Sequence, residues 1–170
     1  MGASLTGFPP SIASIGIKTV LFNIHVRGLW LTYAVYWAAA ATAAVAALAG
    51  APIIPPEQVE ALLNQTAAAP YLDRLVSALG DVALVATLSY PALFFLALWY
   101  GAVTTALIGA LGLGQALTFA ALAHVVLYFY YQLARWHPLA QRLGKRGRIS
   151  WRQYLLWLAL SISLIGVLSL

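Results

Sequence analysis

Two ionisable side chains inside or beside long apolar segments are the first candidates for chemistry in this sequence. His124 lies in an apolar segment among the small residues Ala120, Ala121 and Ala123. Asp81 immediately precedes 53 consecutive residues without a charged side chain. Ionisable groups are costly inside a membrane and often mark proton relays or substrate paths. We therefore interpret Asp81 and His124 as candidates for a transport or proton path, with Arg74 or a partner subunit as the counter-ion of Asp81.

His124 also has the surroundings expected of a tetrapyrrole ligand, because small neighbours leave room for a flat ring beside the imidazole. The stretch from Ala120 to His124, followed by aromatic residues and then Trp136-His137-Pro138, resembles the pigment-binding helix of light-harvesting polypeptides over about 20 residues. That resemblance implies haem or chlorophyll as the cofactor. The simpler interpretation is a neutral histidine that hydrogen-bonds a neighbouring helix.

Other chemistry is poorly represented in this chain. It contains no cysteine, four acidic residues and three histidines, which excludes disulfides, thiol nucleophiles and cysteine-ligated metals. His25 and His137 lie near predicted helix ends, so a haem with two deep histidine ligands is not expected. The sequence has no H-E-x-x-H and no G-x-S-x-G motif. We therefore predict that the protein is not an enzyme and that no cofactor is certain.

The composition indicates an integral membrane protein. Of the 170 residues, 63% are hydrophobic and 8% are charged, whereas soluble domains carry about 25% charged residues. The net charge of +5 comes mainly from one short basic segment between apolar stretches, which is typical of a cytoplasmic loop and not of a nucleic-acid-binding surface. The lipid bilayer is therefore the first expected partner.

The predicted fold is an all-α polytopic transmembrane bundle forming a single domain over residues 1–170, with residues 1–28 as an N-terminal interfacial segment. Hydrophobic length and turn signals favour five spans, at residues 29–49, 72–89, 92–111, 115–135 and 154–170. In a four-span alternative, residues 82–111 form one long helix kinked at Pro91. A strand-like alternation over residues 22–27 leaves the conformation of that short segment open.

Charge and aromatic residues favour the five-span arrangement. It places eight basic residues on the cytoplasmic side against Arg74 outside, whereas four spans give seven against two. It also places the aromatic clusters of residues 90–100 and 128–136 near the cytoplasmic interface. We therefore predict a multi-pass protein of the cell membrane, with the N-terminus and the basic loop 136–152 in the cytoplasm.

Two further patterns concern packing and surfaces. Small residues recur every four positions at Gly101, Thr105 and Gly109, and Ala116 and Ala120 continue the theme. Such residues let helices approach closely within the chain or with a partner. Basic side chains suited to anionic lipid headgroups are Arg142, Lys145, Arg146, Arg148 and Arg152. Ser150 and Gln153 fit the S-x-x-Q capping box at the start of the last helix.

Together these patterns favour a non-catalytic accessory subunit of a larger membrane complex, such as a respiratory or photosynthetic assembly, in contact with other subunits or with further copies of itself. The alternative is a small oligomeric transporter or channel that uses Asp81 and His124. A third hypothesis is a subunit that binds haem or chlorophyll through His124.

Overall fold

The computed structural model shows only helices among the residues it describes, which are 11–143 and 149–170 for the backbone and 27–55, 57–142 and 149–170 for the side chains. Helices satisfy their backbone hydrogen bonds internally, as a lipid environment requires. The helices are α1 (Ser11–Leu48), α2 (Pro56–Ala68), α3 (Tyr71–Leu88), α4 (Tyr90–Leu111), α5 (Leu113–Trp136), α6 (Pro138–Leu143) and α7 (Trp151–Leu168).

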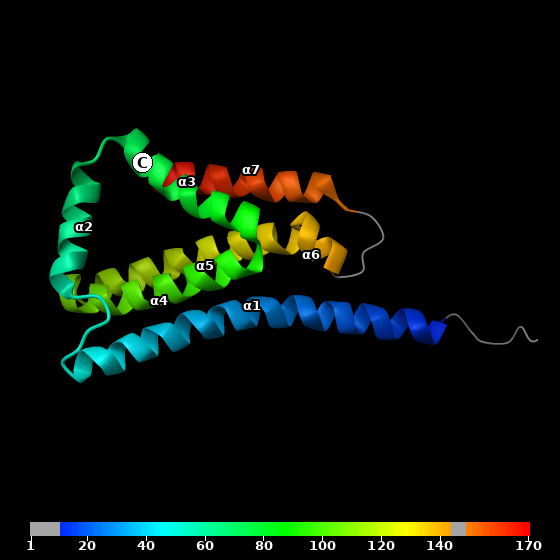
Figure 1. Cartoon of the computed structure of the whole chain (residues 1–170), viewed down its shortest axis with the longest axis horizontal. Helices are drawn as coiled ribbons and strands as arrows, with labels where there is room; N and C mark the ends of the chain where they lie inside the picture. The colour runs from blue at the N-terminus through cyan, green and yellow to red at the C-terminus, as the bar shows by residue number, and fades with distance from the viewer. Residues whose placement is uncertain (1–10, 144–148) are drawn as a thin grey trace, which may run out of the picture.

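Helices α1, α4, α5 and α7 run along the long axis of the molecule, while α2 lies across one end (Figure 1). Helices α4 and α5 form the centre of the bundle. Helix α1 packs mainly on α4, whereas α3 and α7 pack on each other and on α5. Prolines mark the connections, with Pro55 before α2 and Pro70 before α3, and Gly112 (φ 86°) makes the reversal between α4 and α5.

Four described segments are long and apolar enough to cross a membrane: Arg27–Leu48 within α1, and the helices α4, α5 and α7. Helix α3 matches the predicted span 72–89 in position, but it carries Asp73, Arg74 and Asp81 and is less apolar.

The predicted N-terminal interfacial segment has no visible boundary with the first span. Helix α1 continues from Ser11 through Leu48 without a break at residue 28, so the strand-like alternation over residues 22–27 was misleading. Residues 1–10 of the predicted segment lie outside the described residues.

The chain reverses direction at Ser89, between the end of α3 and the start of α4. Ser89 has φ 59° and ψ −127°, a conformation that residues with a side chain rarely adopt. Pro91 lies in the first turn of α4, where its missing N–H is not needed. The single long helix over residues 82–111, kinked at Pro91, is therefore wrong.

Side chains from α7 and from the linker after α5 stabilise this reversal by satisfying the Ala86 carbonyl near the end of α3. The Ala86 carbonyl accepts hydrogen bonds from His137 Nε2 (3.1 Å) and from the Tyr154 hydroxyl (3.0 Å). In return, the Ser89 hydroxyl donates to the Ala134 carbonyl (3.1 Å). The end of α3 is thus tied to the C-terminal end of α5 and the start of α7.

Replacing both donors to the Ala86 carbonyl should destabilise the bundle. We expect the double variant His137→Leu/Tyr154→Phe to lose about 2 kcal/mol, because a half-buried carbonyl loses its partners, and each single variant to lose about half as much. Thermal unfolding of the detergent-solubilised protein, followed by size-exclusion chromatography, measures this loss as a lower Tm. Tyr128→Phe is the control, because the Tyr128 side chain is partly exposed on α5. A double variant that melts like the wild type would contradict the role of these bonds.

The start of α7 confirms the predicted N-cap position but not the capping box. Ser150 precedes the helix, yet its side chain makes no capping hydrogen bond. Instead, the Ser150 N–H donates to Gln141 Oε1 (2.7 Å), and Gln141 Nε2 donates to the Trp136 carbonyl (2.5 Å). The buried Gln141 side chain therefore connects the end of α5 to the start of α7 across the basic loop.

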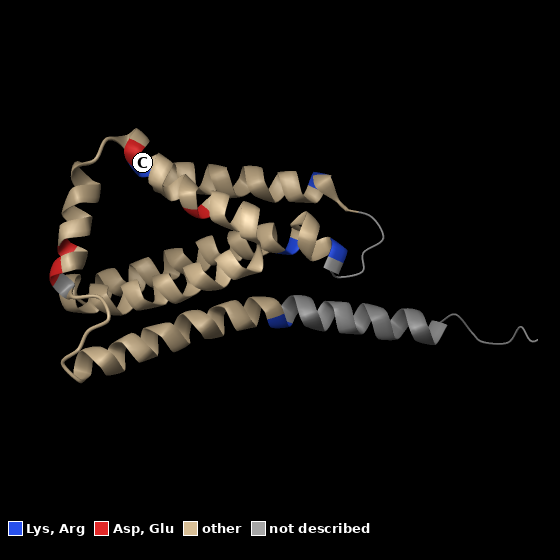
Figure 2. Ribbon diagram, viewed as in Figure 1, with Lys and Arg blue, Asp and Glu red and all other residues tan. Residues whose placement is uncertain are grey.

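Charged residues separate towards the two ends of the bundle (Figure 2). Acidic residues gather at the end formed by α2 and the start of α3, and basic residues gather at the other end, around α6 and the start of α7. Arg142 and Arg152, two of the residues predicted to face lipid headgroups, are exposed there. Lys145, Arg146 and Arg148 lie outside the described residues.

Candidate functional site

Asp81 forms the centre of a polar cluster between α3, α4 and α5. The Tyr100 hydroxyl donates a hydrogen bond of 2.5 Å to Asp81 Oδ2, and the carboxylate is partly buried. Among the described residues Asp81 forms no ion pair, so the expected pairing with Arg74 is wrong; Arg74 Nε is itself buried without a hydrogen-bond partner. The carboxyl group is held by a neutral hydroxyl and has no basic partner among the described side chains.

Tyr130 contributes a second hydroxyl to this cluster from α5. Its side chain is 1% exposed, and the hydroxyl lies beside that of Tyr100 and in the field of Asp81. No hydrogen bond of good geometry reaches the Tyr130 oxygen. An unsatisfied buried hydroxyl costs about 1–3 kcal/mol, so a water molecule or ion beside it would be favourable. The Tyr130 hydroxyl can therefore form a hydrogen bond with one more group.

A second line of hydroxyl groups joins α1 to α4. The Thr104 hydroxyl donates to the Tyr100 carbonyl (2.8 Å), which leaves it as the acceptor for the Tyr36 hydroxyl (2.5 Å). Both side chains are buried. Both buried hydroxyl groups of this pair are hydrogen-bonded, so we interpret the pair as structural.

His124 lies in an aromatic cluster and not beside Asp81. Its ring centroid is 4.9 Å from that of Tyr33, 4.6 Å from Tyr36 and 5.5 Å from Trp37, all on α1. Its Nδ1 donates to the Ala120 carbonyl of its own helix (2.7 Å). The space that small neighbours were expected to leave for a macrocycle thus holds three aromatic rings. The hydrogen bond runs within α5 and not to a neighbouring helix.

The small-residue pattern is used largely within the chain. A Cβ at Gly101 would overlap the Tyr36 carbonyl oxygen and lie 3.1 Å from the Ala39 Cβ, and the Thr105 hydroxyl donates to the Ala40 carbonyl (2.8 Å). Ala116 and Ala120 on α5 are also buried. The close approach predicted from this pattern therefore occurs between α1 and α4.

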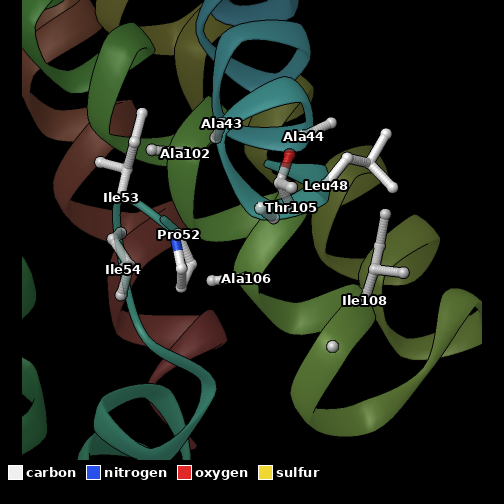
Figure 3. Close-up of a pocket in the computed structure, with 12 residues that line it drawn as sticks. Ala43, Ala44, Leu48, Pro52, Ile53, Ile54, Ala102, Thr105, Ala106 and Ile108 are labelled. Carbon is white, nitrogen blue, oxygen red and sulfur yellow. The ribbon is translucent and has the colours of Figure 1, made fainter. Parts of the chain in front are cut away.

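The remaining small residue, Gly109, lines an apolar pocket of about 350 Å³ between α1, α4 and the linker before α2 (Figure 3). Thr105 supplies the one side-chain hydroxyl of its lining, and that hydroxyl already donates to Ala40. The pocket suits an apolar occupant and offers no titratable group. We therefore place the candidate site at Asp81 and not in this pocket.

Comparison with protein-family models, with curated proteins and with solved structures found no match to this chain. The resemblance of residues 120–138 to light-harvesting polypeptides gains no support from these comparisons.

The sequence had indicated Asp81 but neither of its tyrosine neighbours. Tyr100 and Tyr130 were assigned to aromatic clusters at the membrane interface. A signal was nevertheless present, because Asp81 lies eight residues before Ser89 and Tyr100 eleven residues after it. At 1.5 Å per residue, Asp81 and Tyr100 lie about 12 and about 17 Å from a common turn, which brings them to similar depth.

Proposed function

We propose that this chain is a small multi-pass membrane protein that moves a cation across the bilayer, with Asp81 as the binding carboxylate. The observation that carries this proposal is the Tyr100–Asp81 hydrogen bond near the midpoints of α3 and α4. An acid at membrane depth without a basic partner attracts a cation, and such residues commonly mark ion and proton paths. His124 is a packing residue in this proposal.

The proposal requires α3 to be a fifth span. Its start lies beside the end of α7, where the Tyr71 hydroxyl donates to the Gly166 carbonyl (3.4 Å), and its end lies beside Ala134 at the opposite end of the bundle. Its 18 residues give about 27 Å, close to the roughly 30 Å of a hydrocarbon core. The N-terminus and the basic loop 136–152 then lie in the cytoplasm of a cell-membrane protein, in accord with the positive-inside rule.

Labelling of single cysteines tests this topology, because the natural chain has no cysteine. We expect Ala68→Cys, at the end of α2, to react with an impermeant maleimide on intact cells. We expect Arg142→Cys to react only after permeabilisation. Equal labelling of both positions from one side would contradict five spans.

Ion flux through proteoliposomes tests the function. We expect wild-type protein to carry a cation current under an applied potential and Asp81→Asn to reduce it to the level of protein-free liposomes, because the amide has no charge. Asp73→Asn is the matched control, since Asp73 is an exposed acid on the same helix. Asp81→Glu, which keeps a carboxylate, should retain part of the flux. An Asp81→Asn current equal to that of the wild type would overturn the proposal.

A non-catalytic subunit of a larger complex is the second candidate. The observation that favours it is the outward face of α7, which exposes the large apolar side chains of Leu155, Leu156, Leu160, Ile162 and Val167. Lipid covers such a face as well as another helix does. Purification from native membranes in mild detergent distinguishes the two candidate functions. A subunit would retain stoichiometric partners, whereas a transporter would appear alone or as a homo-oligomer.

A further inference from the structure

We infer that the cation is a proton, and that Tyr130 and Tyr100 relay it to Asp81 from the basic end of the bundle. This inference rests on the proposed function and names the ion that the site accepts. Tyr130 carries the argument, because its hydroxyl is buried, lies beside that of Tyr100 and has no hydrogen bond of good geometry. A water molecule beside such a hydroxyl would satisfy it and can pass a proton to it.

The ligands around Asp81 are too few for a metal cation. A dehydrated metal ion requires a shell of about six or more oxygen ligands, or rings of carbonyl groups that replace its water. The described residues contain no group of three acidic, histidine or cysteine side chains, and the cluster offers one carboxylate and two hydroxyl groups. A proton needs only one carboxylate oxygen and a chain of groups that both donate and accept.

A hydroxyl group stays neutral while it passes a proton, because it binds one proton as it releases another. An incoming proton binds to the Tyr130 oxygen, whose own proton moves to the Tyr100 oxygen, and the Tyr100 proton moves along its existing hydrogen bond to Asp81 Oδ2. One O–H bond forms and one breaks at each tyrosine, and Asp81 becomes a neutral acid. Rotation of both hydroxyls restores the two tyrosines, and Asp81 becomes a carboxylate again when its proton leaves towards the other end of the bundle.

The position of the two tyrosines gives the relay its direction. Tyr130 lies six residues before the end of α5, nearer the basic end than the acidic one. On the helices packed against α3, the titratable groups that act on Asp81 are Tyr100 of α4 and Tyr130 of α5. Arg135 of α5 and Arg152 and Tyr154 of α7 lie towards the basic end, and Asp73 and Arg74 lie on α3 itself. None of these basic groups forms an ion pair with Asp81 among the described residues.

Parallel flux assays on one proteoliposome preparation test this inference. The lumen holds a pH-sensitive dye in one arm, and Na⁺- and K⁺-sensitive dyes in the other two, with gradients imposed separately. We expect Asp81-dependent acidification under a pH gradient and no Asp81-dependent Na⁺ or K⁺ entry. Tyr130→Phe and Tyr100→Phe should each slow acidification about tenfold, because a break in the relay raises its barrier. Tyr128→Phe, on the same helix as Tyr130, should acidify like the wild type.

The outcomes separate this inference from the proposed function. Asp81-dependent Na⁺ or K⁺ entry without proton entry would overturn the proton assignment and leave the transport proposal standing. Asp81-dependent proton entry that is unchanged in both phenylalanine variants would overturn the tyrosine relay. The absence of any Asp81-dependent flux would overturn the proposed function itself. Each variant is first shown to elute as one peak with the wild-type Tm, so that lost flux is not lost folding.

Discussion

Gly101→Leu should separate α1 from α4 and give the largest loss of stability of any single substitution in the described bundle. The reason is that a Cβ at this position overlaps the backbone carbonyl oxygen of Tyr36, which cannot move as a flexible side chain can. The same displacement would break the hydrogen bonds from Tyr36 to Thr104 and from Thr105 to Ala40. We expect a loss of at least about 3 kcal/mol, at the upper end of the overpacking range.

The loss should appear as a Tm lowered by about 6–12 °C in detergent, or as protein that does not elute as a single species. Gly80→Leu is the matched control, because it is also a glycine in a helix interior but has open space where its Cβ would lie. If Gly101→Leu and Gly80→Leu melted at the same temperature, the close contact between α1 and α4 would be contradicted.

Ser89→Val should give the second large loss, at the reversal between α3 and α4. The backbone conformation of Ser89 (φ 59°, ψ −127°) costs a residue with a Cβ about 1–3 kcal/mol, and a β-branched side chain is still less tolerated there. Valine also removes the hydroxyl that donates to the Ala134 carbonyl. We therefore expect a loss of about 2–4 kcal/mol in the same thermal assay.

Ser89→Gly separates the two causes of this loss. Glycine accepts a positive φ without strain but lacks the hydroxyl, so the relief of strain should offset most of the missing hydrogen bond. We expect its Tm to lie within about 3 °C of the wild type. A glycine variant as unstable as the valine variant would indicate that the hydroxyl, and not the backbone conformation, determines stability here.

The helical segments could be predicted from the sequence because their signals are local. Apolar length located α4, α5 and α7, and Gly112 located the reversal between the first two. The break at Ser89 was harder to predict, since its support comes from distant residues. His137 and Tyr154 lie 51 and 68 residues after Ala86 and donate hydrogen bonds to its carbonyl. No local sequence pattern predicts those bonds.

The candidate site was only half predictable for a similar reason. An acid beside an uncharged stretch stands out in any sequence, so Asp81 was found. Tyr100 and Tyr130 did not stand out, because aromatic residues are common near membrane interfaces and their depth depends on where the chain turns. His124 stood out in the sequence because it is ionisable. In the structure, three aromatic rings of α1 surround it, and local sequence patterns do not predict that α1 packs on α5.

Labelling with a carbodiimide tests the central claim, that Asp81 is a protonatable carboxyl inside the membrane on which transport depends. An apolar carbodiimide partitions into the bilayer and adds covalently to protonated carboxylic acids. Proteoliposomes treated for increasing times are divided between a flux assay and peptide mass spectrometry. We predict an adduct at Asp81 and none at the exposed Asp73, with flux falling in proportion to the labelled fraction. Full labelling of Asp81 with unchanged flux, or loss of flux without an adduct at Asp81, would contradict the claim.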